Sequence, residues 1–385
     1  MREFAVVLLV SAIITHLLTP LLRAIAVSLR VMAQPRDRDV HAVPTPYLGG
    51  LALYGGILAG VGVATVLPAL QRTFVYSQDI LGVLAAGGLI CLLGALDDRL
   101  NLDPLTKLVG QIACAGVMVL AGVQITSVYL PFGDLGTVLL GSDVAVPLTI
   151  LLTVLTINAM NFIDGLDGLL AGVAAIAALA FFAYSYNLSL TFSDVASAPT
   201  LIAAVLAGSC LGFLPHNFQP ARIFMGDSGS MLIGIMLAAA AVSATGKADP
   251  QTIGTAATFL PLTLPLLVPL AVLAFPLVDL VLAVLRRARG GRSPFAPDKL
   301  HLHHRLLEIG HSVRRAVLIL YLWTAVLAFG AVAMSVAGQA PRLVLAVAAV
   351  LMVVVVVTTV PSDRGTRGGR RLDQHGSAEA PRRRP

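Results

Sequence analysis

Acidic and amide side chains cluster at three places in a chain that is otherwise strongly apolar. The clusters are Asp97-Asp98, the series Asn158, Asn161, Asp164 and Asp167, and Asp227 within Gly226-Asp227-Ser228-Gly229-Ser230. Carboxylate and amide oxygens are the ligands that Mg²⁺ prefers, and this ion usually keeps water and substrate phosphates in its other coordination positions. The clusters therefore predict a site for a divalent metal ion and a phosphate-containing substrate.

Two of these clusters also have a purely structural explanation. Asp97 and Asp98 end an apolar run, and adjacent carboxylates there repel each other unless a cation such as Lys107 neutralises them. An ordinary acidic cap at the membrane boundary is the alternative. Asp227 or Ser228 could likewise serve only to cap a helix that begins there. A helix start rich in glycine, however, also brings free N–H groups close to a phosphate.

The asparagine and aspartate series is harder to explain by packing. On a helix, Asn158 and Asn161 lie on one face because they are three residues apart. Asp164 and Asp167 would project from the glycine-rich turn that follows. All four are therefore candidates for binding the substrate or the metal ion.

A basic stretch near the C-terminal third of the chain supplies four more candidates. They are His301, His303, His304 and Arg305. Histidines at this spacing could indicate zinc, but no cysteine accompanies them and the surroundings are strongly basic, which favours binding of a diphosphate. A basic stop signal for the preceding apolar run explains the neighbouring arginines but not the histidines. A further motif, Arg36-Asp37-Arg38-Asp39-Val40-His41, is better explained as a charged loop.

The elements that position these residues must be membrane helices. Hydrophobic residues make up 57% of the 385 positions and charged residues 12%, and the mean hydropathy is +0.88. Soluble domains carry about 25% charged residues, so lipid must be the solvent for most of this chain. Apolar runs long enough to span a bilayer predict an all-α fold of eleven helices, at about 3–25, 47–68, 80–96, 105–123, 145–160, 166–185, 199–215, 229–244, 255–285, 315–337 and 342–360. Four prolines predict that the ninth helix is broken.

The basic residues predict how the chain crosses the membrane. Of the 26 Lys and Arg residues, 21 fall on the odd-numbered connections and the C-terminal tail, together with all the polar motifs. The positive-inside rule makes that side cytoplasmic, with the N-terminus outside and the C-terminus inside. Topology thus explains the net charge of +6 without a nucleic-acid partner. We expect a membrane-embedded domain over 1–360 and a disordered basic cytoplasmic tail over 361–385.

Taken together, the motifs resemble those of the polyprenyl-phosphate N-acetylhexosamine-1-phosphate transferases, glycosyltransferase family 4. The resemblance covers about residues 1–337 and rests on Asp97-Asp98, Asn158–Gly168, Gly226–Ser230 and the loop His301-Leu302-His303-His304. The stretch Ser293–His304 looks like the branch that uses UDP-GlcNAc. The branch that uses UDP-MurNAc-pentapeptide for peptidoglycan typically has three consecutive histidines followed by Phe-Glu, which are absent here, and it is the alternative.

The resemblance implies eleven spans with a broken ninth helix, and a reaction at the cytoplasmic face of a bacterial plasma membrane. UDP-GlcNAc and a polyprenyl phosphate would give polyprenyl-diphospho-GlcNAc and UMP, which is the first step of a cell-envelope glycan. The implied cofactor is Mg²⁺, with Mn²⁺ as an alternative. The sequence leaves open the prenyl chain length, the glycan, and whether the protein is a monomer or a homodimer.

The resemblance also assigns roles to residues. Asp227 is the implied metal ligand, with Asn161 close to it. Asp97 and Asp98 match the paired aspartates that activate the lipid phosphate, so the implied catalytic residues are these two and Asp227. Lys107 matches a lysine near the diphosphate.

The implied substrate-binding residues are Lys107, Asn158, Asp164, Asp167, His301, His303, His304 and Arg305. His301, His303 and Arg305 would hold the donor phosphates, and Asp164 and Asp167 would support the nucleotide or the metal ion. The chain departs from the family at position 47, where a tyrosine follows Pro-Thr-Pro instead of the frequent arginine.

Two mechanisms and one other class of protein fit this pattern. In a direct displacement, the lipid phosphate attacks the β-phosphorus of UDP-GlcNAc, whereas a two-step route passes through an aspartyl phosphate. A secondary transporter is the competing class. Transporters place charged groups near the bilayer midplane and often show repeated halves. Here the polar motifs gather at one face and no repeat is visible, which disfavours a transporter.

Overall fold

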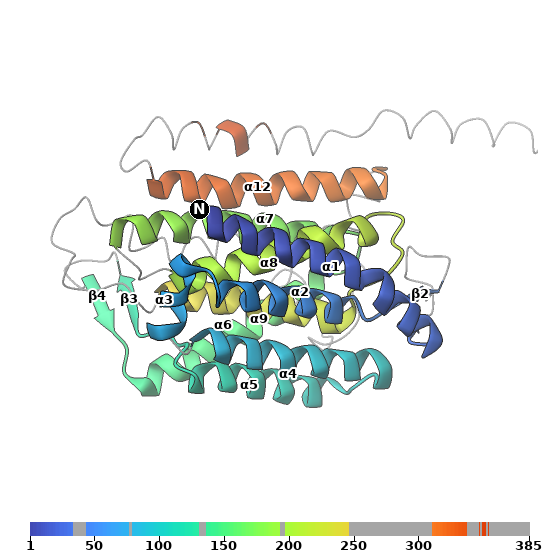
Figure 1. Ribbon diagram of the computed structural model, residues 1–385, viewed down its shortest axis with the longest axis horizontal. Coiled ribbons are helices and arrows are strands. Elements are labelled where there is room, and N and C mark those ends of the chain that lie inside the picture. The colour runs from blue at the N-terminus through green and yellow to red at the C-terminus, as the bar shows by residue number, and fades with distance from the viewer. Residues whose placement is uncertain are drawn as a thin grey trace, which may run out of the picture.

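The computed structural model describes residues 1–33, 44–76, 79–130, 136–192, 197–245 and 310–336, with a few positions between 346 and 353. Within these ranges the chain forms α-helices and two small antiparallel hairpins (Figure 1). The helices are α1 (Arg2–Ser28), α2 (Gly49–Ala64), α3 (Pro68–Tyr76), α4 (Asp79–Leu100), α5 (Pro104–Leu120), α6 (Ser142–Ile163), α7 (Leu169–Phe192), α8 (Ser197–Asn217), α9 (Gly226–Thr245) and α12 (Val313–Val336). Strands β1 (Met32–Ala33) and β2 (Thr45–Pro46) pair at one end of the bundle, and β3 (Ser127–Leu130) and β4 (Gly136–Leu139) pair at the other.

The helices are those of an all-α polytopic membrane protein. Seven described helices are long and apolar enough to cross a membrane, or eight if the bent pair α2 and α3 is one span. The first eight predicted spans and the tenth each coincide with a described helix or helix pair. The ninth predicted span at 255–285, most of the eleventh at 342–360, and the tail at 361–385 lie outside the described residues.

A sharp bend follows α2, at the end of the second predicted span. α2 and α3 are inclined to each other by 107°. Pro68 begins α3, and proline suits a first turn because it has no backbone N–H to leave unpaired. The carboxylate of Glu3 accepts a hydrogen bond from the N–H of Ala69 at 2.9 Å and so stabilises the start of α3. The predicted span over 47–68 therefore coincides with α2 and ends at the bend that precedes α3.

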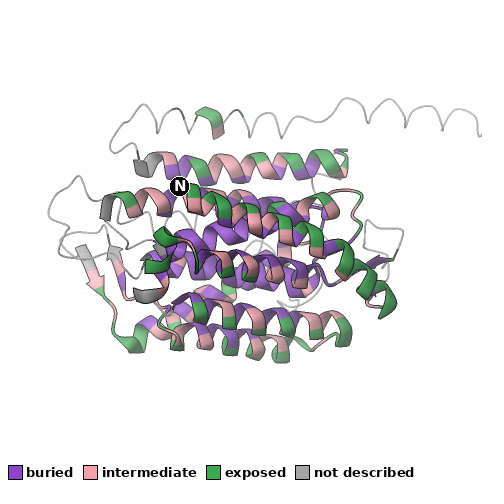
Figure 2. Ribbon diagram, viewed as in Figure 1, coloured by how far each residue is buried: buried purple, intermediate pink, exposed green. Residues whose placement is uncertain are grey.

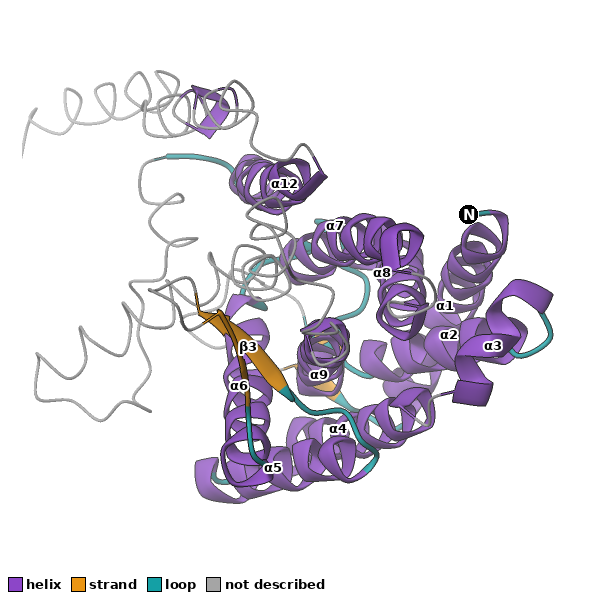
Figure 3. Cartoon of the chain, turned by 90° about the vertical axis from the view of Figure 1, so that its left-hand side faces the viewer, coloured by secondary structure: helices purple, strands orange, loops and turns teal. Residues whose placement is uncertain are grey.

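α9 lies at the centre of the bundle. It packs against α2, α4, α6 and α8 (Figure 3), and 89% of its apolar segment is buried, against 22% for α1. Figure 2 shows the same change from a buried centre to exposed outer faces. Outward-facing leucines such as Leu17 on α1 and Leu92 on α4 fit a surface that lies against lipid. A side chain in the first turn of α9 therefore stands in the middle of one end of the bundle.

Glycines let two helices approach the start of α9 through their backbones. A Cβ added to Gly94 of α4 would overlap Cα of Ser228, and one added to Gly50 of α2 would overlap the backbone nitrogen of Gly229. Small residues at the interface are a common way for membrane helices to pack closely. Gly50 and Gly94 thus fix the position of α9 relative to α2 and α4.

Replacing Gly94 with alanine is expected to destabilise the protein by about 1–3 kcal/mol, because the added methyl group meets backbone atoms that cannot move aside. Thermal unfolding and the yield of monodisperse protein in detergent measure the effect. Gly116→Ala on α5 is the matched control, since a Cβ there meets nothing within 4 Å, and alanine favours a helix over glycine. Equal losses in the two variants would contradict this account of the packing.

Candidate active site

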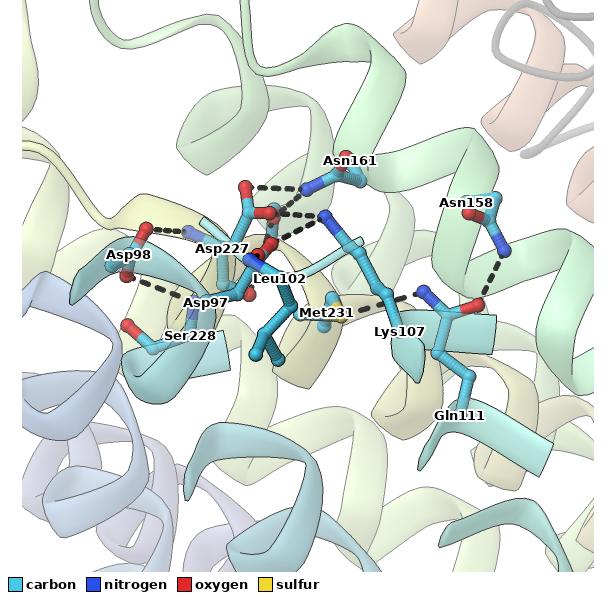
Figure 4. A network of polar contacts seen from close by, with 11 residues as sticks. Asp97, Asp98, Leu102, Lys107, Gln111, Asn158, Asn161, Asp227, Ser228 and Met231 are labelled. Carbon is cyan, nitrogen blue, oxygen red and sulfur yellow. Dashed lines mark hydrogen bonds and ion pairs between the residues drawn. The ribbon is translucent and has the colours of Figure 1, made fainter. Parts of the chain in front are cut away.

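Three helices bring polar side chains together at one end of the bundle (Figure 4). Asp97 stands near the end of α4, Lys107 near the start of α5 and Asp227 in the first turn of α9. Nζ of Lys107 lies 2.9 Å from Oδ2 of Asp97 and also forms an ion pair with Oδ2 of Asp227. The expectation that a lysine neutralises the aspartate pair is confirmed for Asp97.

Asn161, near the end of α6, contacts Asp227 from the other side. Its Nδ2 donates to Oδ1 of Asp227 at 2.8 Å and to Oγ of Ser230 at 2.8 Å. Each carboxylate oxygen of Asp227 therefore has a donor, one from α5 and one from α6. The prediction that Asn161 lies close to Asp227 is confirmed.

Asp98 contacts the main chain of α9 and not Lys107. Its Oδ1 accepts a hydrogen bond from the N–H of Asp227 at 2.8 Å, and its Oδ2 accepts one from the N–H of Ser228 at 3.4 Å. A carboxylate in this place caps the helix and is favoured by the helix dipole. The N–H groups of Asp227 and Ser228 therefore already have an acceptor, and contact between the start of α9 and a substrate phosphate stays a prediction.

Gly226 is required for this cap. Its φ angle is +68°, in the left-handed region that glycine adopts without strain. A Cβ at this position would also overlap the carboxylate of Asp98. The glycine therefore allows the turn into α9 and the approach of Asp98 at the same time.

The segment before α2 is anchored beside the segment before α9. The N–H of Phe224 donates to the carbonyl oxygen of Pro46 at 2.9 Å, and the N–H of Gly49 donates to the carbonyl oxygen of Phe224 at 3.1 Å. The N–H of Gly50 donates to the carbonyl oxygen of Met225 at 3.0 Å. The segments Pro44–Pro46 and Gly49–Gly50 therefore support the turn that carries Asp227.

The turn between α4 and α5 determines where Lys107 stands. Oδ1 of Asp97 accepts a hydrogen bond from the N–H of Leu102 at 2.8 Å. Asp103 is the N-cap of α5, and its Oδ1 accepts from two backbone N–H groups of the first turn, each at 3.1 Å. The Thr106 hydroxyl also donates a hydrogen bond to Oδ2 of Asp103. This bond, followed by the backbone hydrogen bonds, holds the pKa of Asp103 below its ordinary value. Lys107 follows in the same turn.

Asp164 follows the last residue of α6 and is partly buried. Burial, followed by the negative charges of Asp227, Asp98 and Asp167, raises the pKa of Asp164 to about 8. Among the described residues around Asp164, negative charge is therefore in excess, even with Lys107 present. Additional positive charge would be favourable there.

Replacing Asp164 with asparagine is expected to stabilise the protein at alkaline pH. A carboxyl whose pKa is higher in the folded state than in the unfolded state destabilises the fold increasingly from about pH 4 to pH 8, and by a constant amount above pH 8. We expect an advantage on the order of 1 kcal/mol, or roughly 3 °C, at pH 9 that shrinks toward pH 5. Thermal unfolding in detergent across this range measures it, and a pH-independent difference would contradict the raised pKa.

Asp167 is buried and joins two loops. Its Oδ2 accepts a hydrogen bond from the N–H of Ala221 at 2.9 Å, in the connection between α8 and α9. Nearby, Oδ1 of Asn217 accepts from the N–H of Gly168 at 3.1 Å, and its Nδ2 donates to the carbonyl oxygen of Ile223 at 3.0 Å. These contacts make Asp167 part of the support for the turn after α6. Its contact with a nucleotide stays a prediction.

Asn158 belongs to a separate polar contact. Its Nδ2 donates to Oε1 of Gln111 at 2.7 Å and to the carbonyl oxygen of Val154 at 2.8 Å. Gln111 is 1% exposed, and its Nε2 lies 3.5 Å from Sδ of Met231. Gln111 was not among the residues predicted from the sequence. The available signal was an amide within an apolar helix, one turn after Lys107.

Two predicted motifs lie outside the described residues. They are Arg36–His41 and the basic loop with His301, His303, His304 and Arg305. The assignment of the basic loop to the donor diphosphate therefore stays a prediction.

The donor atoms at this end of the bundle fit Mg²⁺. Asp227 and Asp97 offer carboxylate oxygens and Asn161 offers an amide, which are groups that hard cations prefer. Among the described residues, no three His, Cys, Asp or Glu side chains are arranged as a complete metal cage. Mg²⁺ commonly binds proteins through one or two carboxylates and takes its other ligands from water and substrate phosphates. The residues present therefore suit a metal ion that is shared with a diphosphate.

Part of the chain matches a known protein family. Residues 80–245 match the family described as glycosyl transferase family 4. The matched segment contains Asp97, Asp98, Lys107, Asn161 and Asp227. It thus includes the residues that meet at the end of the bundle.

Individual relatives match over most of their length. The chain is 50% identical over 333 residues to the decaprenyl-phosphate N-acetylglucosaminephosphotransferase of Mycobacterium leprae (strain TN), which covers 86% of this chain and 83% of that protein. It is 32% identical to the probable undecaprenyl-phosphate N-acetylglucosaminyl 1-phosphate transferase of Bacillus subtilis (strain 168), with 84% and 82% covered. It is 30% identical to the undecaprenyl-phosphate alpha-N-acetylglucosaminyl 1-phosphate transferase of Escherichia coli (strain K12), with 80% and 77% covered.

Proposed function

We propose that this chain, which belongs to glycosyl transferase family 4, transfers N-acetylglucosamine 1-phosphate from UDP-GlcNAc to a polyprenyl phosphate. The products are polyprenyl-diphospho-GlcNAc and UMP. The observation that carries the proposal is the group of Lys107, Asp97, Asp227 and Asn161 at one end of a membrane-spanning bundle. A reaction between a water-soluble diphosphate and a lipid phosphate needs such polar groups where helices leave the lipid.

The reaction takes place on the cytoplasmic face of the plasma membrane. The basic residues support this side, because 21 of the 26 Lys and Arg residues fall on the connections and tail that the sequence predicts to be cytoplasmic. Asp97 and Lys107 lie on either side of one such connection, and Asp227 follows another. A nucleotide sugar would therefore reach the site directly from the cytoplasm.

The chemical step is a direct displacement. An oxygen of the lipid phosphate attacks the β-phosphorus of UDP-GlcNAc, the bond from that phosphorus to the bridging oxygen breaks, and UMP leaves with the electron pair. Lys107 stands beside Asp97 and Asp227, where its ammonium can contact the diphosphate and neutralise the charge that develops on it. Lys107 therefore takes part through electrostatic stabilisation.

The acceptor phosphate needs little help from a base. The second pKa of a phosphate monoester is about 6, so the acceptor is mostly deprotonated at neutral pH. Both carboxylate oxygens of Asp98 accept hydrogen bonds from the N–H groups of Asp227 and Ser228. This geometry supports a positioning role for Asp98 in place of the proton removal that the family resemblance implies.

Asp227 and Asn161 would hold a Mg²⁺ ion, and a bound ion would neutralise the negative charge of the donor diphosphate. Chelation by EDTA is accordingly expected to reduce UMP release to background, and added Mg²⁺ to restore it. Mn²⁺ is expected to restore it as well. Activity that survives EDTA would contradict a metal requirement, and recovery with Zn²⁺ alone would favour the zinc interpretation of the histidine loop.

The proposed reaction is tested with purified full-length protein, labelled UDP-GlcNAc, and either decaprenyl or undecaprenyl phosphate. UMP release together with a labelled lipid product is the expected result. UDP-MurNAc-pentapeptide serves as the competing donor. If the folded protein releases UMP only from that donor, or from neither, the proposal is wrong.

The direct displacement has its own test. The protein is incubated with UDP-GlcNAc in the absence of the lipid acceptor, quenched, and examined by mass spectrometry. We expect no phosphorylated aspartate and no release of UMP in proportion to the enzyme. A trapped aspartyl phosphate would establish the two-step route instead.

A further inference from the structure

A second, uncharged layer of polar side chains lies beneath the charged residues of the site. The charged layer is Lys107 and Asp227 together with the neutral Asn161 that donates to Asp227. The amide layer is Gln111 on α5 and Asn158 on α6, together with the thioether of Met231 on α9 that Gln111 contacts. On each helix the amide-layer residue lies three or four positions, about one turn, further into the bundle than the charged-layer residue. Figure 4 shows the two layers beside each other.

The hydrogen bonds of the amide layer can run in only one direction. A thioether sulfur has no hydrogen to donate, so Nε2 of Gln111 faces Sδ of Met231 and Oε1 faces Asn158. Nδ2 of Asn158 gives one hydrogen to Oε1 of Gln111 at 2.7 Å and the other to the carbonyl oxygen of Val154 at 2.8 Å. Both hydrogens of the Asn158 amide are therefore used. No group among the described residues donates to its Oδ1, which is turned away from Gln111 (Figure 4).

We propose that Gln111 is a positioning residue for substrate recognition, and that through it Asn158 presents Oδ1 to a hydroxyl or amide N–H of the sugar nucleotide. This inference rests on the proposed function. Gln111 is 1% exposed and cannot contact the substrate itself, whereas Asn158 is partly exposed. Gln111 therefore acts through Asn158.

The chemistry of the amide layer selects the kind of group that it recognises. The layer offers no cation to a phosphate and no carboxylate to a metal ion. Ionised phosphate oxygens only accept hydrogen bonds, so they gain nothing from the acceptor Oδ1 of Asn158. A neutral donor group is the partner that fits. The sugar of the proposed substrate carries both kinds, hydroxyl groups and the N–H of its acetamido group.

The competing explanation is that these amides only join helices, as polar side chains often do within membranes. The variants Gln111→Leu and Asn158→Ala separate the two explanations. Each is expected to raise KM for UDP-GlcNAc about tenfold, the loss that corresponds to one neutral hydrogen bond. We expect kcat, the KM for the lipid and the Mg²⁺ requirement to change by less than about threefold. The double variant is expected to lose little more than either single variant, because the two residues share one interaction.

A conservative variant provides the control. Gln111→Glu keeps the shape of the side chain, and a carboxyl buried there stays protonated, so it can still accept from Asn158 and donate to Met231. Its KM is expected to stay within about threefold of the wild-type value. A merely structural role would lower the thermal stability of Gln111→Leu without raising KM.

UDP-glucose, which lacks the acetamido group, shows which group of the sugar donates the hydrogen bond to Asn158. If the acetamido N–H is recognised, the preference for UDP-GlcNAc over UDP-glucose falls in Asn158→Ala, and if a hydroxyl is recognised, both ligands weaken equally. Wild-type protein without UMP release would overturn the proposed function and this inference with it. Active wild-type protein, together with an unchanged KM in Gln111→Leu and Asn158→Ala, would overturn this inference alone.

Discussion

Replacing Asp227 with alanine is expected to slow UMP release by about a hundredfold to a thousandfold while the protein stays folded in the membrane. Asp227 contacts the polar residues of three other helices at this site. Its side chain pairs with Lys107 and accepts from Asn161, and its backbone N–H donates to Asp98. The substitution removes the proposed metal ligand, and it leaves Lys107 with Asp97 as its partner.

The experiment needs a control for folding. Asp143 is exposed in the first turn of α6, at the opposite end of the helix from Asn161. Asp143→Ala is therefore expected to keep the wild-type rate within about twofold. Size-exclusion chromatography and thermal unfolding show whether Asp227→Ala is intact. An intact Asp227→Ala variant with more than about a tenth of the wild-type rate would contradict the assignment.

Replacing Asp98 distinguishes a helix cap from a general base. Asp98→Ala leaves two N–H groups at the start of α9 without their acceptor. We expect it to lose about 1–2 kcal/mol of stability and, because Asp227 is no longer held, about a hundredfold in rate. Asp98→Asn keeps an oxygen that accepts from the N–H of Asp227, and it is expected to retain at least about a tenth of the wild-type rate.

A general base would behave differently. An asparagine amide cannot take up a proton, so Asp98→Asn would then lose as much activity as Asp98→Ala. The pH dependence of kcat would also lose its rising limb in Asp98→Asn. We expect the pH profile of Asp98→Asn to keep the wild-type shape. Equal losses in the two variants would restore the role of a base.

The sequence predicts the existence of the helices better than their contacts. A bilayer requires about 20 apolar residues per span, so hydropathy locates α1, α4 to α6, α8 and α9 within a few residues, whereas α7 continues to Phe192, past the predicted end at 185. It does not show the bend between α2 and α3 or the hydrogen bond by which Glu3 stabilises the start of α3. Nor does it show that Asp98 caps α9, because the two partners are 129 positions apart and only packing brings them together.

For the site, too, the sequence predicts which residues take part better than it predicts what each of them contacts. The sequence offers Lys107 as a partner for the aspartate pair, and the family resemblance implies that Asn161 lies close to Asp227, as the structure has them. Asp164 and Asp167 look alike in the sequence, since each precedes a glycine-containing turn or lies within one. Yet Asp167 accepts a hydrogen bond from the loop between α8 and α9, whereas Asp164 is subject to the negative charges of neighbouring carboxylates. Environment, not spacing, makes them different.

The close backbone approach at Gly50 and Gly94 has a practical consequence. Because α2 and α4 meet α9 through main-chain atoms, the place of Asp98 at the start of α9 does not depend on the bulk of outward-facing side chains. Leucines such as Leu17 and Leu92 form a separate outer shell. Replacing these outward-facing apolar residues with glutamate and lysine is a route to a water-soluble version of the enzyme. Such a version would allow crystallisation and ligand screening without detergent.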